Sequence, residues 1–277
     1  MKNKVSRKDF TEANMPHNRK EVFKDLLINR TSTLFSLGLM MFLFSLPLIA
    51  AIIFSNLSIS SFDLTNLENN KELYNDFLRN LNTNNLLILI GLVILSFGIS
   101  GTYKIIRLLI WQEGIFFYSD FFNGIKSNWK GFALTFFIIG IINFVSQYLF
   151  YNVNINEYPF VACVIVIAFF LPCVLFILGQ TTIYNMPYLH KLKNSFLLSW
   201  RNWYTSIPVV LLNALFIILP LLIKNVLAYI ILIIVIPIII APLLVLFNTL
   251  YTDTIFDKYI NKDNFKEIYD KGIYRNG

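Results

Sequence analysis

Six apolar runs without a charged residue constrain this chain more than any other feature. A bilayer core about 30 Å thick is crossed by roughly 17–25 apolar residues of α-helix, which rises about 1.5 Å per residue. The runs are Thr33–Phe54, Leu86–Tyr103, Phe132–Tyr151, Phe160–Leu178, Ile207–Ile223 and Val226–Phe247. A segment in lipid must satisfy its backbone hydrogen bonds internally. The sequence therefore predicts an all-α fold, a polytopic transmembrane helical bundle with six spans.

The last two runs are separated only by Lys224 and Asn225. A single helix from Ile207 to Phe247 would far exceed the thickness of the bilayer. We expect a tight hairpin on the outer side, with a re-entrant pair of helices as the alternative.

The basic residues are distributed unevenly among the seven polar pieces that the runs leave. Twenty of the 23 lysines and arginines lie in the first, third, fifth and seventh pieces, and only Lys71, Arg79 and Lys224 lie in the others. Cytoplasmic loops of membrane proteins carry an excess of Lys and Arg. This bias predicts that both termini are cytoplasmic and that the protein resides in the cell membrane.

The net charge of +7 follows from the same distribution. Basic residues beside a membrane are attracted to the anionic lipids of the inner leaflet. We therefore expect the bilayer, with its anionic inner leaflet, to be the main partner, and we expect no nucleic-acid binding.

The runs also define the organisation of the chain. We expect a cytoplasmic N-terminal segment over 1–32, a membrane domain over 33–251 and a charged cytoplasmic tail over 252–277. Within the membrane domain we expect an outer loop over 55–85, in which a short helix lies against the membrane surface. The inner connectors are expected over 104–131 and 185–206.

Each cytoplasmic piece before a span contains an amphipathic stretch. Apolar residues recur at helical spacing in three sets: Val22, Phe23, Leu26 and Leu27; Phe117, Phe121 and Ile125; and Leu189, Leu192, Phe196 and Trp200. This pattern is typical of helices that lie in the membrane interface. Ordinary interfacial packing is one interpretation, and a docking surface for a cytoplasmic partner is the other. The dipeptides Asn128-Trp129 and Asn202-Trp203 close two of these stretches, where Trp is a common interface anchor.

The spans contain no side chain suited to acid–base or metal chemistry. Catalysis of that kind needs ionisable groups brought together, and proton-coupled carriers place such groups at mid-depth. His17 and His190 lie in different pieces without other ligands at metal-binding spacing. Cys163 and Cys173 are ten residues apart, so a helix separates them by about 15 Å, beyond disulfide reach. We expect no enzyme activity, cofactor or metal.

A few polar residues do lie within the spans. Asn143 and Gln147 are four residues apart and share a helix face, and Asn213 lies in the fifth span. They predict either a polar lining for a sugar-like solute or hydrogen bonds between helices. Pro237 and Pro242 make the sixth span the best candidate for a broken helix, which can mark a binding site or simply be tolerated in a membrane.

Residues 98–130 resemble the signature of the bacterial YesL-like family of integral membrane proteins. The matching positions are Gly101, Tyr103, Lys104, Arg107, Glu113, Phe121, Phe122, Lys126, Asn128, Trp129 and Lys130. Residues 192–208, the tail from Phe247 to Ile260, and Phe44-Ser45-Leu46-Pro47 are similar to other parts of that family. Family members pass from the first span to the second through a short turn, whereas this chain inserts residues 55–85.

The resemblance implies a multi-pass protein associated with carbohydrate uptake and polysaccharide use, and it provides no catalytic residues to transfer. We expect an accessory or regulatory component of solute uptake, which acts on a transporter or sensor subunit through its cytoplasmic face. The alternatives are a transporter with a path between spans 3, 5 and 6, and a lipid-interacting structural protein. The candidate partner surface comprises Glu113, Phe121, Phe122, Lys126, Asn128, Trp129, Asn202 and Trp203. For Glu113 the alternative is a solvated charge paired with Lys104, Arg107 or Lys126.

Overall fold

The computed structural model describes residues 16–62, 70–152, 158–223 and 225–274, and within these ranges the chain forms helices and no strand. The helices, in chain order, are α1 (Arg19–Asn29), α2 (Thr31–Ser60), α3 (Lys71–Ile110), α4 (Phe117–Asn152), α5 (Tyr158–Ile183), α6 (Tyr188–Arg201), α7 (Trp203–Ile218), the 3₁₀ turn η2 (Leu219–Leu222), α8 (Val226–Val235), the π-helix η3 (Ile236–Ile240), α9 (Ala241–Phe256), the π-helix η4 (Asp257–Asn261) and α10 (Lys262–Asn264). The predicted all-α class is confirmed.

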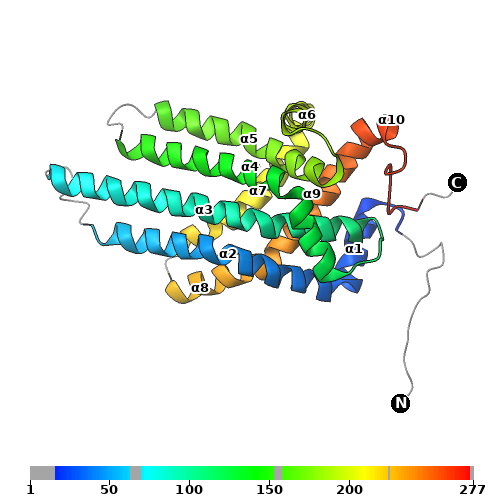
Figure 1. The fold of residues 1–277 in the computed structure, drawn as a ribbon, viewed down its shortest axis with the longest axis horizontal. Helices are drawn as coiled ribbons and strands as arrows, with labels where there is room; N and C mark the ends of the chain where they lie inside the picture. Colours follow the sequence, from blue (N-terminus) through cyan, green and yellow to red (C-terminus); the bar gives the residue numbers. More distant parts are fainter. Residues whose placement is uncertain (1–15, 63–69, 153–157, 224, 275–277) are drawn as a thin grey trace, which may run out of the picture.

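The long helices run side by side along the longest axis of the molecule (Figure 1). α3 packs along both α2 and α4, α4 packs on α5, and α9 contacts α1, α2, α3 and α5. Four helical segments are long and apolar enough to cross a membrane: Thr31–Ser60, Lys71–Ile110, Phe117–Leu149 and Leu227–Asn264. The architecture is compatible with a helical membrane bundle.

The helix starts have identifiable local causes. Asn18 accepts a hydrogen bond from the Glu21 backbone N–H at 3.0 Å, and its side-chain amide donates to the Glu21 carboxylate at 2.7 Å. Asn70 caps α3 by accepting from the backbone of Glu72 and Leu73, and Asn225 caps α8. Asn is among the best N-cap residues because its side-chain oxygen satisfies an otherwise unpaired backbone donor. The same residue type therefore begins helices at both ends of the bundle.

The structure corrects the prediction for residues 55–85. α2 continues to Ser60, α3 begins at Lys71, and residues 63–69 lie outside the described ranges. The part of this segment from Lys71 onward, where we expected a short helix against the membrane surface, is the first part of α3 and continues into the apolar run that begins at Leu86. Phe77 and Leu81 are buried, so packing supports this extension.

The inner connectors differ from one another. No separate helix forms over 104–131, because α3 continues to Ile110 and α4 begins at Phe117, with a tight turn between them. Gln112 adopts a positive φ of 57° in that turn. By contrast, α6 is a separate helix and is seen end-on in Figure 1, so it lies across the direction of the long helices.

Apolar side chains remain exposed along the long helices while polar ones are buried. Phe35, Leu39, Leu43 and Leu46 lie along one exposed face of α2, whereas Ser96, Ser100, Thr102 and Thr135 are inaccessible within the bundle. A contiguous exposed apolar face of this kind marks contact with a membrane or another protein. It supports the membrane assignment independently of helix length.

The main hydrophobic core lies toward one end of the bundle. Its fully buried members include Leu37, Ile106, Phe121, Phe132 and Leu246. The first and last described segments meet beside it, where the Tyr274 backbone N–H donates to the Pro16 carbonyl at 2.9 Å. We call this region the terminal end of the bundle.

The last long helical segment is continuous from Leu227 to Asn264, so the broken helix that we expected from the two prolines does not form; a π-helical stretch around Pro237 is accommodated within it. η3 packs on α2. A Cβ added to Gly38 of α2 would lie 1.7 Å from the Ile238 carbonyl oxygen, so only glycine permits this approach. The irregular backbone therefore packs against a neighbouring helix at this position.

Candidate functional site

A cavity of about 730 Å³ lies between the C-terminal parts of α3 and α5, the first half of α4 and the start of α6. Its lining contains four cationic side chains and no acidic one. The cations are Lys104 and Arg107 from α3, Lys130 from α4 and Lys191 from α6. Uncharged polar groups come from Ser127, Asn128, Thr181, Thr182, Tyr184, Asn185 and Tyr188. We call this cavity the basic pocket.

The walls of the basic pocket meet through a close approach of α4 and α5. A Cβ added to Gly131 would lie 2.6 Å from Cγ2 of Thr181, which is closer than real Cβ contacts. Both residues line the pocket. Glycine at this position therefore sets the separation of the two helices at the pocket wall.

A buried glutamine holds α6 against the bundle. Gln180 of α5 is fully buried, and its Nε2 donates to Ser195 Oγ at 2.7 Å and to the Lys191 carbonyl at 3.4 Å. Lys191 and Ser195 are four residues apart and share the inward face of α6. The outward side presents Leu189, Phe196, Leu197 and Trp200 as exposed apolar residues. α6 therefore directs its polar side toward the protein and exposes much of its apolar side.

Lys191 is the most buried of the four cations. It is only 8% exposed, and burial lowers the pKa of its ammonium group. Among the described residues no carboxylate lies within ion-pair distance of it. Partial burial of a cation without a counter-ion is unfavourable, because it removes part of the water that hydrates the charge.

The other three cations of the pocket also lack an ion-pair partner in the described part of the chain. The Arg107 guanidinium lies 4.8 Å from the centroid of the Trp111 ring, and the Lys130 ammonium lies 5.8 Å from that of Trp129. Arg107 and Lys104 repel each other electrostatically. The carboxylates of Glu113 and Asp253 act on Arg107 only from beyond ion-pair distance. The pocket therefore concentrates positive charge.

Tyr188 and Thr135 join α6 to α4 beside the pocket. Their hydroxyl oxygens are 3.0 Å apart. Burial raises the pKa of Tyr188, and the hydrogen bond to Thr135 opposes that effect. The tyrosine is thus a neutral hydrogen-bonding group at the pocket wall.

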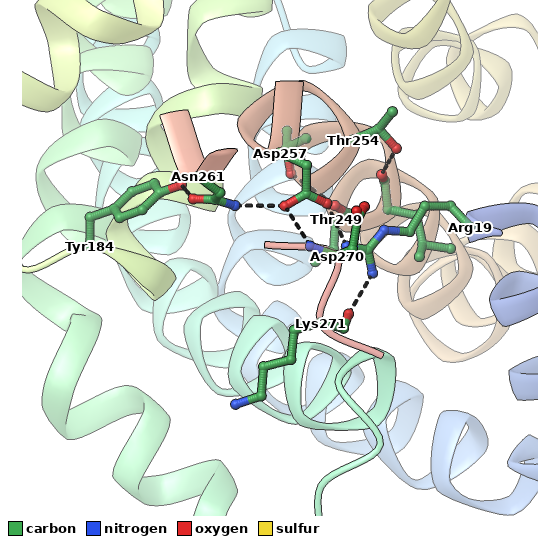
Figure 2. Close-up of polar contacts among 10 residues, drawn as sticks. Arg19, Tyr184, Thr249, Thr254, Asp257, Asn261, Asp270 and Lys271 are labelled. Carbon is green, nitrogen blue, oxygen red and sulfur yellow. Dashed lines mark hydrogen bonds and ion pairs between the residues drawn. The ribbon is translucent and has the colours of Figure 1, made fainter. Parts of the chain in front are cut away.

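A second group of polar residues, at the terminal end, contains a buried ion pair by contrast (Figure 2). Arg19 of α1 forms a salt bridge of 2.7 Å with Asp257 of η4, and both side chains are largely buried. Arg19 also donates to the Lys271 carbonyl at 3.0 Å, and Asn261 donates to Asp257 at 2.8 Å. Tyr184 in turn donates to Asn261. We call Arg19, Asp257, Asn261 and Tyr184 the terminal network.

The terminal network ties together three distant parts of the chain. Arg19 belongs to the first described helix, Tyr184 follows α5, and Asp257 and Asn261 belong to η4. Burial is the first cause that raises the pKa of Tyr184, and the charges of Asp253 and Asp257 add to it. The phenol therefore stays protonated and acts as a hydrogen-bond donor. The network therefore holds these three segments together and has a structural role.

Two further features adjoin the terminal network. Lys271 pairs with Glu113 at 2.5 Å, and its ammonium lies 4.4 Å from the centroid of the Trp111 ring. Asp253 of α9 is buried, and neither carboxylate oxygen has a hydrogen-bond partner by distance and angle among the described residues. The charges of Arg19, Asp257 and Arg107 all act on Asp253. Asp253 is therefore close enough to interact electrostatically with charged residues of both the terminal network and the basic pocket.

The predicted partner surface is only partly a surface. Phe122, Trp129 and Trp203 are exposed, as is Lys126, whereas Asn128 lines the basic pocket. The prediction that Phe121 belongs to an exposed partner surface is wrong, because its side chain is completely buried and packs against Gly101 of α3. The helical spacing that placed it on an amphipathic face was right, but that face is covered by the protein.

Glu113 and Asn202 have partners that the sequence did not indicate. Glu113 pairs with Lys271 of the C-terminal segment, and not with Lys104, Arg107 or Lys126. Asn202 joins α6 to α7, because its side chain donates to the Leu198 carbonyl and its own carbonyl accepts from Ser206. Trp203, the first residue of α7, packs on Tyr204 with ring centroids 3.9 Å apart.

The predicted polar lining is not assembled in one place. Asn213 of α7 and Asn248 of α9 exchange two amide hydrogen bonds, of 3.0 and 2.9 Å. This pair favours the interpretation of Asn213 as an interhelical contact. Asn143 and Gln147 are half-buried on α4, and none of the three residues lines the basic pocket.

Sequence reasoning missed Gln180, Lys191 and the terminal network as functional elements. A glutamine at the inner end of a charge-free span was the available signal for Gln180, because such a group needs a partner in a membrane protein. No local signal links Arg19 to Asp257. Within the described ranges no cluster of His, Cys, Asp and Glu side chains could hold a metal ion. Cys173 is buried and reduced, and the side chain of Cys163 lies outside the described part.

Comparison with family models, with curated proteins and with solved structures finds no match to this chain.

Proposed function

We propose that the chain is a six-span protein of the cell membrane, with both termini in the cytoplasm, that serves as a non-catalytic accessory or regulatory component of solute uptake. The observation that carries the proposal is the contrast between the two parts of the bundle. Its long helices expose apolar side chains, whereas the terminal end gathers cations, connectors and both described chain ends. A cationic end of this kind is suited to electrostatic contacts with an acidic partner.

The helix lengths support six spans. Beyond the four long apolar segments, α5 has 26 residues, which corresponds to about 39 Å of helix. α7 has 16 residues and continues into the four residues of η2, a combined length of about 32 Å. Each length suffices for a hydrocarbon core of about 30 Å. The resemblance to the YesL-like family supports the link to carbohydrate uptake.

Accessibility of single cysteines tests the orientation. In a chain with Cys163 and Cys173 replaced by alanine, Lys71→Cys should react in intact cells with a membrane-impermeant thiol reagent, and Asn264→Cys should react only after permeabilisation. Both positions are exposed in the structure, so burial cannot explain a difference. The opposite labelling pattern would refute the proposed orientation.

Site-specific photo-cross-linking tests the accessory role. A photoreactive residue at Trp129, exposed near the start of α4, should capture a transporter or sensor subunit. The matched control is Tyr148, which is equally exposed on the same helix but lies five turns away. Capture from Tyr148 alone, or a product consisting only of this chain, would contradict a cytoplasmic docking surface.

One observation favours the transporter as a second candidate. Asn84 and Asn85 of α3 are buried, and both amide atoms of Asn84 lack hydrogen-bond partners in the described part of the chain. Buried amides without partners are costly, and a polar solute could satisfy them. Uptake of labelled sugar into proteoliposomes that is abolished by Asn84→Leu and retained by Thr83→Leu would favour this function.

A further inference from the structure

The cations of the basic pocket are the unusual feature of the terminal end. Nearby, Arg19 and Lys271 each have a carboxylate partner, so other cations at this end of the bundle are paired within the fold. The four cations of the pocket have none within ion-pair distance in the described residues, and Lys191 is nearly inaccessible. Burying a cation is favourable only when it is paired. The pocket is therefore electrostatically prepared for an anion that the described residues do not provide.

An apolar ridge leads directly out of the pocket. Leu134 of α4 lines the pocket and is also exposed. From it, exposed residues recur along one face of α4 with helical spacing, namely Phe137, Ile141, Val145 and Tyr148. Over the 14 residues from Leu134 to Tyr148 this ridge extends about 21 Å. A charged site and a long apolar track therefore meet at one point of the surface.

We infer that the basic pocket binds the phosphate-bearing headgroup of an anionic phospholipid, whose acyl chains lie along the α4 ridge from Leu134 to Tyr148. The assignment of this lipid to the cytoplasmic leaflet rests on the orientation proposed above. The binding site itself does not rest on that orientation.

The side chains present suit a phosphodiester. A guanidinium such as that of Arg107 can donate two parallel hydrogen bonds to phosphate oxygens, and the ammonium groups of Lys104, Lys130 and Lys191 add charge-assisted donors. The neutral side chains of Asn128 and Tyr188 can hydrogen-bond to a headgroup hydroxyl. Basic pockets between transmembrane helices on the cytoplasmic side are a known means of binding anionic headgroups. A soluble phosphate would make the same polar contacts but would leave the ridge unused.

Native mass spectrometry of the full-length chain in detergent micelles tests the inference. The protein is titrated with phosphatidylglycerol, with phosphatidylcholine as the zwitterionic comparison and inorganic phosphate as the competitor. We expect retention of phosphatidylglycerol in preference to phosphatidylcholine, without displacement by inorganic phosphate. Equal retention of the two lipids would overturn the site. Displacement of the lipid by inorganic phosphate at comparable concentration would overturn the lipid assignment in favour of a soluble phosphate.

Charge-matched variants locate the lipid. Lys191→Gln and Lys130→Gln should each weaken phosphatidylglycerol binding about fivefold, since one basic residue near a membrane surface contributes about 1 kcal/mol. The controls are Lys193→Gln on α6, two residues from Lys191, and Lys126→Gln on α4, four residues from Lys130, which remove the same charge. Both control lysines are exposed and do not line the pocket, so their effects should stay within about twofold.

Two variants separate a loss of lipid binding from a loss of folding. Lys130 is exposed, so its replacement carries little risk to folding, and Lys191→Arg should retain binding because it keeps the charge. Equal losses in pocket and control variants would indicate diffuse attraction and would overturn the inference. The measurement uses isolated protein in micelles, so neither a missing transporter partner nor a reversed orientation would change its outcome.

Discussion

The terminal network and the basic pocket lie at neighbouring parts of the same bundle but treat their cations in opposite ways. In the terminal network, Arg19 has a carboxylate at 2.7 Å and a backbone carbonyl at 3.0 Å. In the basic pocket, Lys191 is equally withdrawn from solvent but has no counter-ion within ion-pair distance in the described residues. The difference separates charges that hold the fold together from charges that are available to a ligand.

The two sites should differ most in how substitutions change the free energy of unfolding. Removing one member of a buried pair leaves the other uncompensated, which costs more than the pair contributes. Removing an unpaired buried cation instead relieves a desolvation cost. Substitutions of basic residues at the two sites should therefore change stability in opposite directions.

The largest expected effect is at Arg19. Arg19→Ala should destabilise the protein by about 3–5 kcal/mol because Asp257 is left buried without its cation. Thermal unfolding in detergent, followed by tryptophan fluorescence, measures the loss. Lys20→Ala is the matched control, since Lys20 is its exposed neighbour on α1. The double variant Arg19→Met with Asp257→Leu should recover much of the stability; equal losses in all three variants would show that the pair is not the cause.

The next effect concerns the wall of the basic pocket. Gly131→Ala would place a methyl group against Thr181, and overpacking of this kind costs about 1–3 kcal/mol. The same unfolding measurement should show it, and the wider separation of α4 and α5 should also weaken phosphatidylglycerol binding. Gly114→Ala is the control, because an added Cβ there meets no atom within 4 Å. A fully stable Gly131→Ala would mean that Thr181 yields and that the helices can separate freely.

A smaller effect, of opposite sign to that at Arg19, is expected at Lys191. Without added anionic lipid, Lys191→Met should leave the protein as stable as the wild type or more stable by up to about 1 kcal/mol, since a charge without a counter-ion is removed. Added phosphatidylglycerol should stabilise the wild type more than the variant. Lys193→Met, on the exposed side of α6, provides the comparison. A loss as large as that of Arg19→Ala would remove the distinction between the two sites.

The smallest effect is expected at the exposed pair of the terminal end. Lys271 and Glu113 are each about one-third exposed, so Glu113→Gln should cost about 0.2–1 kcal/mol and less at high salt. Glu267→Gln is the control, because Glu267 is exposed on the same tail. A salt-independent loss of several kcal/mol would show that this pair belongs energetically with Arg19 and Asp257.

The helical class followed from the sequence because helix formation in an apolar environment depends on local composition. Charge-free runs of bilayer length leave the backbone no other partner for its hydrogen bonds. The amphipathic spacing around Phe121 was also real. Which surface that face would meet was not local information, since Gly101 of α3 supplies the space that buries the ring.

Other elements also combine a pattern visible in the sequence with a contact that only the tertiary structure reveals. The apolar spacing on α6 was visible, and the structure leaves Leu189, Phe196 and Trp200 exposed. That Lys191 and Ser195 point inward depends on Gln180, which belongs to a different helix. Over residues 55–85, loop-like composition suggested a break after the first apolar run, whereas the Asn70 cap starts α3 well before the second run.

By itself, the sequence determined the helical class, the apolar lengths and the uneven distribution of basic residues, because each is a property of single segments in lipid or water. Only the tertiary structure decided which of those basic residues are paired. An ion pair exists where two side chains meet within a few ångströms, and Arg19 and Asp257 are 238 positions apart in the chain. Packing of the first and last described segments onto one end of the bundle pairs that cation, whereas those of the basic pocket have no counter-ion within ion-pair distance in the described residues.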